Sequence, residues 1–254
     1  MIHPSAIIDP KAELADDVEV GPYSIIGAHV QIDSGTVVGP HVVINGHTTI
    51  GKNNRFFQFS SIGEENQDKK YQGEPTKTII GDNNVFRESC TVHRGTVQDI
   101  GYTQIGSDGL FMAYTHVAHD CIVGDHVIMA NNATIAGHVH VGDWVILGGF
   151  TGVHQFCKIG AHAFAGMNSS ITQDIPPYVM LQRGVPRAIN TEGLKRRGFS
   201  NQDIRAVRNA FRELYRKEQK LDVALEAIKE LAADNSAVQL FADFIAASER
   251  GIVR

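Results

Sequence analysis

Residues 117–159 read, in steps of six, VAHDCI VGDHVI MANNAT IAGHVH VGDWVI LGGFTG VHQFCK I. Each step begins with an aliphatic residue or methionine, and along the chain the residue four places later is usually small. A period of six is longer than the alternation of a plain strand and does not match the helical period of about 3.6. It predicts a short strand and a turn, repeated, so that three units close a triangular coil of about eighteen residues.

The six-residue frame covers most of residues 1–185. It runs from Ile2 to Ile62, resumes from Ile80 to Val92, and continues in a shifted phase from Ile105 to Ile171. Residues one coil apart within a run are therefore expected to stack, at the strand spacing of about 4.8 Å. The pattern predicts a mainly β protein whose parallel sheets form a three-sided prism.

Two stretches interrupt the frame, at residues 63–79 and 94–104. Both are mainly polar, and the first is also rich in charged residues. They predict loops that leave the prism, and functional residues favour loops carried by a rigid scaffold. A tolerated surface insertion is the alternative.

The repeat ends near residue 176, and the rest of the chain predicts an α-helical domain over residues 186–254. Ser200 followed by Asp203 resembles a capping box that begins a helix, and apolar residues then recur at helical spacing. Residues 183–220 hold 11 of the 23 basic residues and carry a formal charge of +7, against −12 for the rest of the chain. This asymmetry indicates docking of an acidic partner; a solvated basic helix face is the alternative.

Composition and missing motifs exclude several classes of protein. A formal charge of −5 disfavours a general nucleic-acid binder. The three cysteines all stand at the small step of the repeat, which predicts buried packing residues and neither disulfides nor a nucleophile. No apolar run approaches the ~20 residues of a membrane span, and no signal-peptide pattern is visible, so we expect a soluble cytoplasmic protein. The common nucleotide-binding and hydrolase motifs are missing, and no cofactor is predicted.

Histidines gather in the third run of the repeat. Seven of the 12 lie between His116 and His162, and none occupies the apolar or small step, so they are expected to point outward or lie at corners. His119 with Asp120 offers a general base beside a carboxylate that orients it. Gly137 lies one coil after His119, so its N–H could stabilise an oxyanion. Zinc held by outward histidines such as His116 and His119, as in the gamma-class carbonic anhydrases, is the alternative; our interpretation needs no metal.

Three segments make the pattern specific: His-Val-Ala-His-Asp at 116–120, Val-His-Gln-Phe at 153–156, and Glu-Gly-Leu-Lys-Arg-Arg-Gly-Phe at 192–199. With them the chain resembles the acyl-carrier-protein–UDP-N-acetylglucosamine O-acyltransferases of lipid A synthesis, a branch of the hexapeptide-repeat acyltransferase family. The resemblance extends over essentially the whole chain. It implies a left-handed parallel β-helix with C-terminal helices, assembled as a homotrimer with active sites between neighbouring prisms.

The resemblance also implies a reaction. An (R)-3-hydroxyacyl group would pass from acyl carrier protein to the glucosamine 3-hydroxyl of UDP-N-acetylglucosamine. His119 would remove the hydroxyl proton, Asp120 would hold His119 in place, and the N–H of Gly137 would stabilise the oxyanion, without a metal or cofactor. The acidic carrier protein would dock on the basic segment 183–220.

Further positions match substrate-binding residues of the family. They are Asp68 and Lys70 on the first loop, His116 and His138 in the cleft, His154 and Gln155 toward the acyl chain and nucleotide, and Asn190, Glu192, Arg196 and Arg197 toward uridine and diphosphate. Met167 stands where the family varies between glycine and bulkier residues, at the end of the acyl groove, so a medium donor, roughly decanoyl, is expected. Two alternatives remain: another hexapeptide acyltransferase that uses acetyl-CoA or a different nucleotide sugar, and a non-catalytic β-solenoid scaffold.

Overall fold

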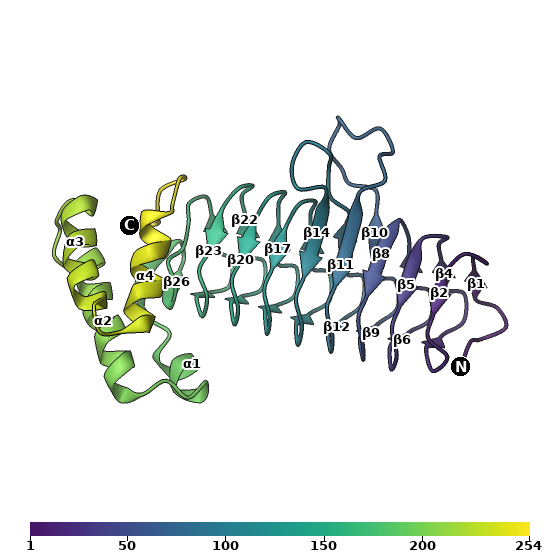
Figure 1. The fold of residues 1–254 in the computed structure, drawn as a ribbon, viewed down its shortest axis with the longest axis horizontal. Coiled ribbons are helices and arrows are strands. Elements are labelled where there is room, and N and C mark those ends of the chain that lie inside the picture. Colours follow the sequence, from purple (N-terminus) through teal and green to yellow (C-terminus); the bar gives the residue numbers. More distant parts are fainter.

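The computed structural model describes residues 1–254, which form a three-sided left-handed β-helix followed by a group of helices (Figure 1). The first sheet contains β1 (Ile7–Ile8), β4 (Ile25–Ile26), β7 (Val43–Ile44), β10 (Ser61–Glu64), β13 (Thr91–His93), β16 (His116–Val117), β19 (Thr134–Ile135), β22 (Gly152–Val153) and β25 (Ser170–Ile171). The second contains β2 (Glu13–Leu14), β5 (Val30–Ile32), β8 (His47–Ile50), β11 (Lys77–Ile80), β14 (Tyr102–Ile105), β17 (Ile122–Val123), β20 (His140–Val141) and β23 (Lys158–Ile159). The third contains β3 (Glu19–Val20), β6 (Val37–Val38), β9 (Arg55–Phe56), β12 (Val85–Phe86), β15 (Leu110–Phe111), β18 (Ile128–Met129), β21 (Ile146–Leu147), β24 (Phe164–Ala165), β26 (Val179–Gln182) and β27 (Val185–Ile189).

The pairing register confirms the stacking expected from the repeat. Within the third run, partners in neighbouring strands lie one coil apart, as in His116 opposite Thr134 and Ile122 opposite His140. All sheet pairs are parallel except the pair of β26 with β27. Apart from β26 and β27, consecutive strands belong to different sheets, and the chain turns at three edges. We call these the first edge (first to second sheet), the second edge (second to third) and the third edge (third to first).

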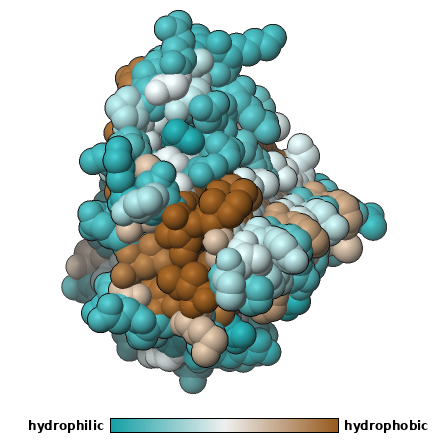
Figure 2. All heavy atoms as spheres, turned by 90° about the vertical axis from the view of Figure 1, so that its right-hand side faces the viewer, coloured by the Kyte–Doolittle hydropathy of each residue, from teal (hydrophilic) through white to brown (hydrophobic).

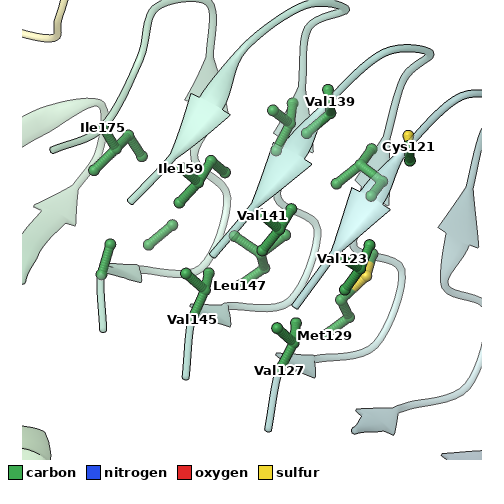
Figure 3. Close-up of a cluster of buried hydrophobic side chains, with 14 of the residues drawn as sticks. Cys121, Val123, Val127, Met129, Val139, Val141, Val145, Leu147, Ile159 and Ile175 are labelled. Atoms are coloured by element: carbon green, nitrogen blue, oxygen red, sulfur yellow. The ribbon is translucent and has the colours of Figure 1, made fainter. Parts of the chain in front are cut away.

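The interior of the prism is filled by the apolar and small steps of the repeat. Figure 3 shows Val123, Val141 and Ile159 of the second sheet pointing inward from successive coils. The three cysteines are free and buried, as predicted. At the N-terminal end no further coil covers this interior. Ile8 and Leu14 are only partly buried there, and Figure 2 shows an apolar patch on that end.

The C-terminal helices are α1 (Thr191–Arg196), α2 (Asn201–Arg216), α3 (Leu221–Ala232) and α4 (Ser236–Ala246). Ser200 caps α2 as predicted, because its hydroxyl oxygen accepts a hydrogen bond from the N–H of Asp203 at 3.0 Å. None of the four helices is both long enough and apolar enough to cross a bilayer.

The hairpin of β26 and β27 is not predicted from the sequence, and the expected boundary between 185 and 186 falls inside β27. The strands are joined by Arg183 and Gly184, which both have positive φ, as a tight two-residue hairpin turn requires. Because the six-residue period has already ended there, periodicity gives no signal for this hairpin.

Candidate functional site

The first edge carries the candidate site. His119 and Asp120 lie there between β16 and β17, and Gly137 and His138 lie one coil further along. Two loops leave the prism from the same edge on the preceding coils. They occupy 65–76 and 94–101, and are shorter than expected from the sequence because β10 extends to Glu64 and because β11 and β14 begin earlier than the repeat indicated. Both loops stand out from the prism in Figure 1.

Asp120 is fully buried and holds His119. Its carboxylate lies 2.9 Å from Nδ1 of His119 and accepts hydrogen bonds from the N–H and hydroxyl of Thr96. Burial alone would raise the pKa of Asp120, but the hydrogen bonds from His119 and Thr96 outweigh burial, and the pKa lies below its ordinary value. The ionised carboxylate accepts a hydrogen bond from the N–H at Nδ1, so Nε2 of His119 is the basic nitrogen, and Nε2 makes no hydrogen bond within the protein.

Gly137 lies directly against the ring of His119. A Cβ at this position would lie 2.5 Å from Cε1 and 2.7 Å from Nε2 of His119, so any side chain there would force the ring to move. The N–H of Gly137 has no acceptor within the protein. At the second edge, by contrast, the N–H groups of Ser107 and Asp125 at the same step of the repeat donate to aspartates one coil further along. The glycine therefore leaves one free donor beside the basic nitrogen.

His138 faces His119 from the next coil. The two rings meet edge to face with centroids 4.9 Å apart, and the His138 ring also stacks on Phe156 at 4.3 Å. Nδ1 of His138 contacts Asp99 of the second loop at 2.5 Å. Sequence reasoning did not identify Asp99, because nothing in a polar loop outside the repeat frame marks one acidic residue above another.

His116 lies on β16 of the first sheet, three residues before His119, and hydrogen bonding and ring contacts also fix its side chain. Its Nδ1 is 2.7 Å from the hydroxyl of Thr91, and its ring meets His93 edge to face. Burial, with smaller contributions from the charges of His93 and His119, lowers the pKa of His116 to about 4. His116 is therefore neutral near pH 7 and suits a wall of the cleft better than a second proton acceptor.

A metal ion is a possible occupant by composition, since His119, Asp120 and His138 offer ligand atoms within 4.8 Å of one another. However, the Asp120 carboxylate is already engaged by Thr96 and His119, and Nδ1 of His138 is engaged by Asp99. A metal ion would have to displace the hydrogen bonds that Thr96 and His119 make to the buried carboxylate of Asp120, and the one between His138 and Asp99. The arrangement as it stands suits proton transfer.

Two other pairs of expected binding residues also belong to the first edge or its loops. On the first loop, Asp68 is half-buried and its side chain accepts from the N–H of Lys70, whose side chain is exposed. His154 and Gln155 are exposed on the coil that follows Gly137, and His154 contacts Arg250 at 3.1 Å. All four remain candidates for substrate contact.

The remaining expected residues do not converge with His119 within one chain. Met167 lies at the third edge, 63% exposed, beside a cavity of about 410 Å³ that Phe164 and Met180 also line. Glu192 and Arg196 are exposed on α1. These positions belong to other edges and to the helices, so a single prism does not bring them to the basic nitrogen.

Asn190 and Arg197 are engaged within the chain. Asn190 is only 8% exposed, and its side chain caps α1 and donates to the carbonyl of His162 at 3.1 Å. Arg197 lies over the ring of Trp144 at 5.0 Å, with Nη1 at 3.1 Å from Nδ1 of His162. Asn190 thus holds the segment, whereas the half-buried Arg197 retains further donors.

Comparison with known proteins shows which family the chain resembles. Residues 102–137 match the profile of the bacterial transferase hexapeptide repeat, and residues 174–253 match that of domain 2 of UDP-N-acetylglucosamine O-acyltransferase. The chain is 59% identical to acyl-[acyl-carrier-protein]–UDP-N-acetylglucosamine O-acyltransferase of Thiobacillus denitrificans and 54% identical to that of Stutzerimonas stutzeri, over 100% of this chain and 99% of each relative.

Solved structures lead to the same family. The fold superposes on UDP-N-acetylglucosamine acyltransferase of Francisella novicida with a TM-score of 0.98 and 41% identity, covering 100% of this chain and 94% of that one. For UDP-N-acetylglucosamine O-acyltransferase of Moraxella catarrhalis the TM-score is 0.96 with 46% identity, covering 100% and 99%. The resemblance stated from the sequence is confirmed: the chain belongs to the acyl-[acyl-carrier-protein]–UDP-N-acetylglucosamine O-acyltransferase family.

Proposed function

We propose that this protein transfers an (R)-3-hydroxyacyl group from acyl carrier protein to the 3-hydroxyl of UDP-N-acetylglucosamine, the first step of lipid A synthesis. The substrates follow from the names of relatives that share more than half of its residues. The observation that carries the chemistry is the buried Asp120 carboxylate, which leaves Nε2 of His119 free beside an unused N–H of Gly137.

In the proposed mechanism, Nε2 of His119 takes the proton of the sugar hydroxyl as the oxygen attacks the thioester carbon. Asp120 stabilises the imidazolium that forms, and the N–H of Gly137 donates to the oxyanion of the tetrahedral intermediate. The intermediate then collapses, the ester is formed, and the carrier thiolate leaves and takes the proton from His119. No covalent enzyme intermediate is needed.

We propose that the protein acts as a homotrimer. The outer face of the third sheet carries an unbroken apolar ladder of paired residues. Its members are Leu110, Ile128, Ile146, Phe164 and Met180. Because Met167 and Arg197 lie far from the first edge of their own prism, they could reach His119 only from a neighbouring subunit, and packing along this ladder would bring a neighbour close.

The basic segment 183–220 is the proposed dock for acyl carrier protein. Two of its lysines are paired within the helices, Lys195 with Glu192 and Lys217 with Glu213. Several arginines, among them Arg183, Arg205 and Arg212, are exposed and form no ion pair in the chain. Free guanidinium groups would attract an acidic partner and speed its encounter with the enzyme.

Met167 would end the acyl groove and favour a donor of about ten carbons. Each further buried methylene is worth about 0.8 kcal/mol if the groove has room for it. We expect Met167→Gly to shift the preference from decanoyl toward myristoyl donors, measured as the ratio of kcat/KM for the two. An unchanged ratio would show that Met167 does not set the length of acyl chain that the enzyme prefers.

The function is tested by incubating the protein with UDP-N-acetylglucosamine and 3-hydroxydecanoyl carrier protein, and weighing the nucleotide product by mass spectrometry. We expect a product heavier by one 3-hydroxyacyl group, and no acetylated product when acetyl-CoA replaces the donor. Acetyl transfer would identify another hexapeptide acyltransferase, and no transfer from either donor would support the scaffold alternative.

A further inference from the structure

The second loop places a buried residue against the carboxylate of the site. Thr96 is 1% exposed, and both its N–H and its hydroxyl donate to Asp120. We propose that Thr96 is a positioning residue for the acyl transfer, which acts through Asp120 on His119. This inference rests on the proposed function, because it requires His119 to act as the base.

The contacts show what Thr96 does to the carboxylate. Its N–H lies 2.9 Å from Oδ1 and 3.1 Å from Oδ2 of Asp120, and its hydroxyl lies 2.7 Å from Oδ2. The only other side-chain hydrogen bond to this carboxylate comes from His119, at 2.9 Å from Oδ2. A fully buried carboxylate needs such donors to remain ionised, and three of these four contacts come from Thr96.

Thr96 also helps to fix which histidine the carboxylate of Asp120 hydrogen-bonds. His138 is the other imidazole within reach, with Nδ1 3.9 Å from Oδ2 of Asp120. The hydroxyl of Thr96 fixes Oδ2 toward His119, while Asp99 occupies Nδ1 of His138. Without the hydroxyl, Oδ2 keeps only the bonds from the N–H of Thr96 and from His119, so the carboxylate holds the orientation and tautomer of the base less firmly.

The chain before Thr96 is held closely enough for this task. The carbonyl of Gly95 accepts from the side chain of Asn66 at 3.0 Å, and a Cβ on Gly95 would lie 2.2 Å from the N of Tyr102. Arg94 donates to the hydroxyl of Tyr71 on the first loop at 3.2 Å, which ties the second loop to the first. Thr96 is therefore set by the interlocked loops, and no feature of the repeat could have identified it.

A double-mutant cycle tests the proposal, using Thr96→Val, Thr96→Ser, Asp120→Asn and the Thr96→Val/Asp120→Asn pair. We expect Thr96→Val to lower kcat about 10- to 100-fold, as expected for losing a hydrogen bond to a buried charge, while KM for UDP-N-acetylglucosamine stays within about threefold. Thr96→Ser keeps the hydroxyl and should restore kcat to within about threefold. In the Asp120→Asn background, Thr96→Val should add less than about threefold, because its target is gone.

The matched control is Thr36→Val, which removes a buried hydroxyl that bonds to Gly51 and Asn54 far from the site. It should cost stability without lowering kcat. If Thr96→Val does not fold, Thr96→Cys takes its place in the cycle. Two results would overturn the inference: an unchanged kcat in Thr96→Val, or a double variant whose loss of kcat equals the product of the two single losses. In either case an active wild type leaves the proposed function standing. An inactive wild type would remove the function itself.

Discussion

A single methyl group added at Gly137 should disable the site and leave the prism folded. In Gly137→Ala the new Cβ would lie 2.5 Å from Cε1 and 2.7 Å from Nε2 of His119, whereas ordinary contacts for a Cβ begin at 3.4 Å. The ring must therefore withdraw by about 1 Å, and a shift of that size costs about 100-fold in rate. The backbone is not strained, because Gly137 does not have positive φ.

The displacement has a second cost, because it pulls Nδ1 of His119 away from Asp120, to which it now bonds at 2.9 Å. We expect kcat to fall about 100- to 1000-fold with little change in KM for the nucleotide sugar, measured under saturating carrier-protein donor. The melting temperature should change by only a few degrees, because about 1 kcal/mol corresponds to a shift of that order.

Gly152→Ala is the matched control, since a Cβ there would meet nothing within 4 Å. It should keep kcat within about twofold of wild type, as usual for surface substitutions. A Gly137→Ala enzyme that turns over at the wild-type rate would refute the close approach of glycine and imidazole on which the mechanism depends.

Three further predictions concern the buried histidines, the contact of Arg197 with Trp144, and the metal alternative. Burial lowers the pKa of His116 and His162 to about 4, so as pH falls the unfolded chain takes up their protons first. The free energy of unfolding from urea titrations should therefore decline between pH 6.5 and about 4, and a flat curve there would contradict buried neutral rings. Trp144→Ala removes the aromatic face beneath Arg197 and should raise KM for UDP-N-acetylglucosamine about two- to fivefold at constant kcat; an unchanged KM would show that Arg197 does not bind the nucleotide. Dialysis against a chelator should leave activity intact, and loss restored by zinc would favour the metal alternative.

The repeat predicted the prism because its physics is local and periodic. Each apolar step must turn inward, so counting one coil forward places Gly137 beside His119, and the structure has them in contact. The same count fails outside the frame. The hairpin of β26 and β27 follows no period, and only a two-residue turn at Arg183 marks it.

The loop residues of the site could not be predicted for a related reason. Thr96 and Asp99 reach Asp120 and His138 through tertiary folding of an irregular segment, and their positions depend on contacts distant in the sequence. Asn190 is a different case: family resemblance marks it for the nucleotide, and only the structure shows that its side chain caps α1. A motif therefore identifies a residue but does not predict which hydrogen bonds its side chain makes within the fold.

The central claim is that one imidazole at the first edge removes the sugar hydroxyl proton. The most direct test compares kcat of wild type and His119→Ala, alongside the Kd of each for UDP-N-acetylglucosamine from calorimetry. We predict that kcat falls by about a thousandfold, within the range of a lost general base, while Kd changes by no more than about threefold. A His119→Ala protein that still transfers the acyl group at a rate near wild type would contradict the account.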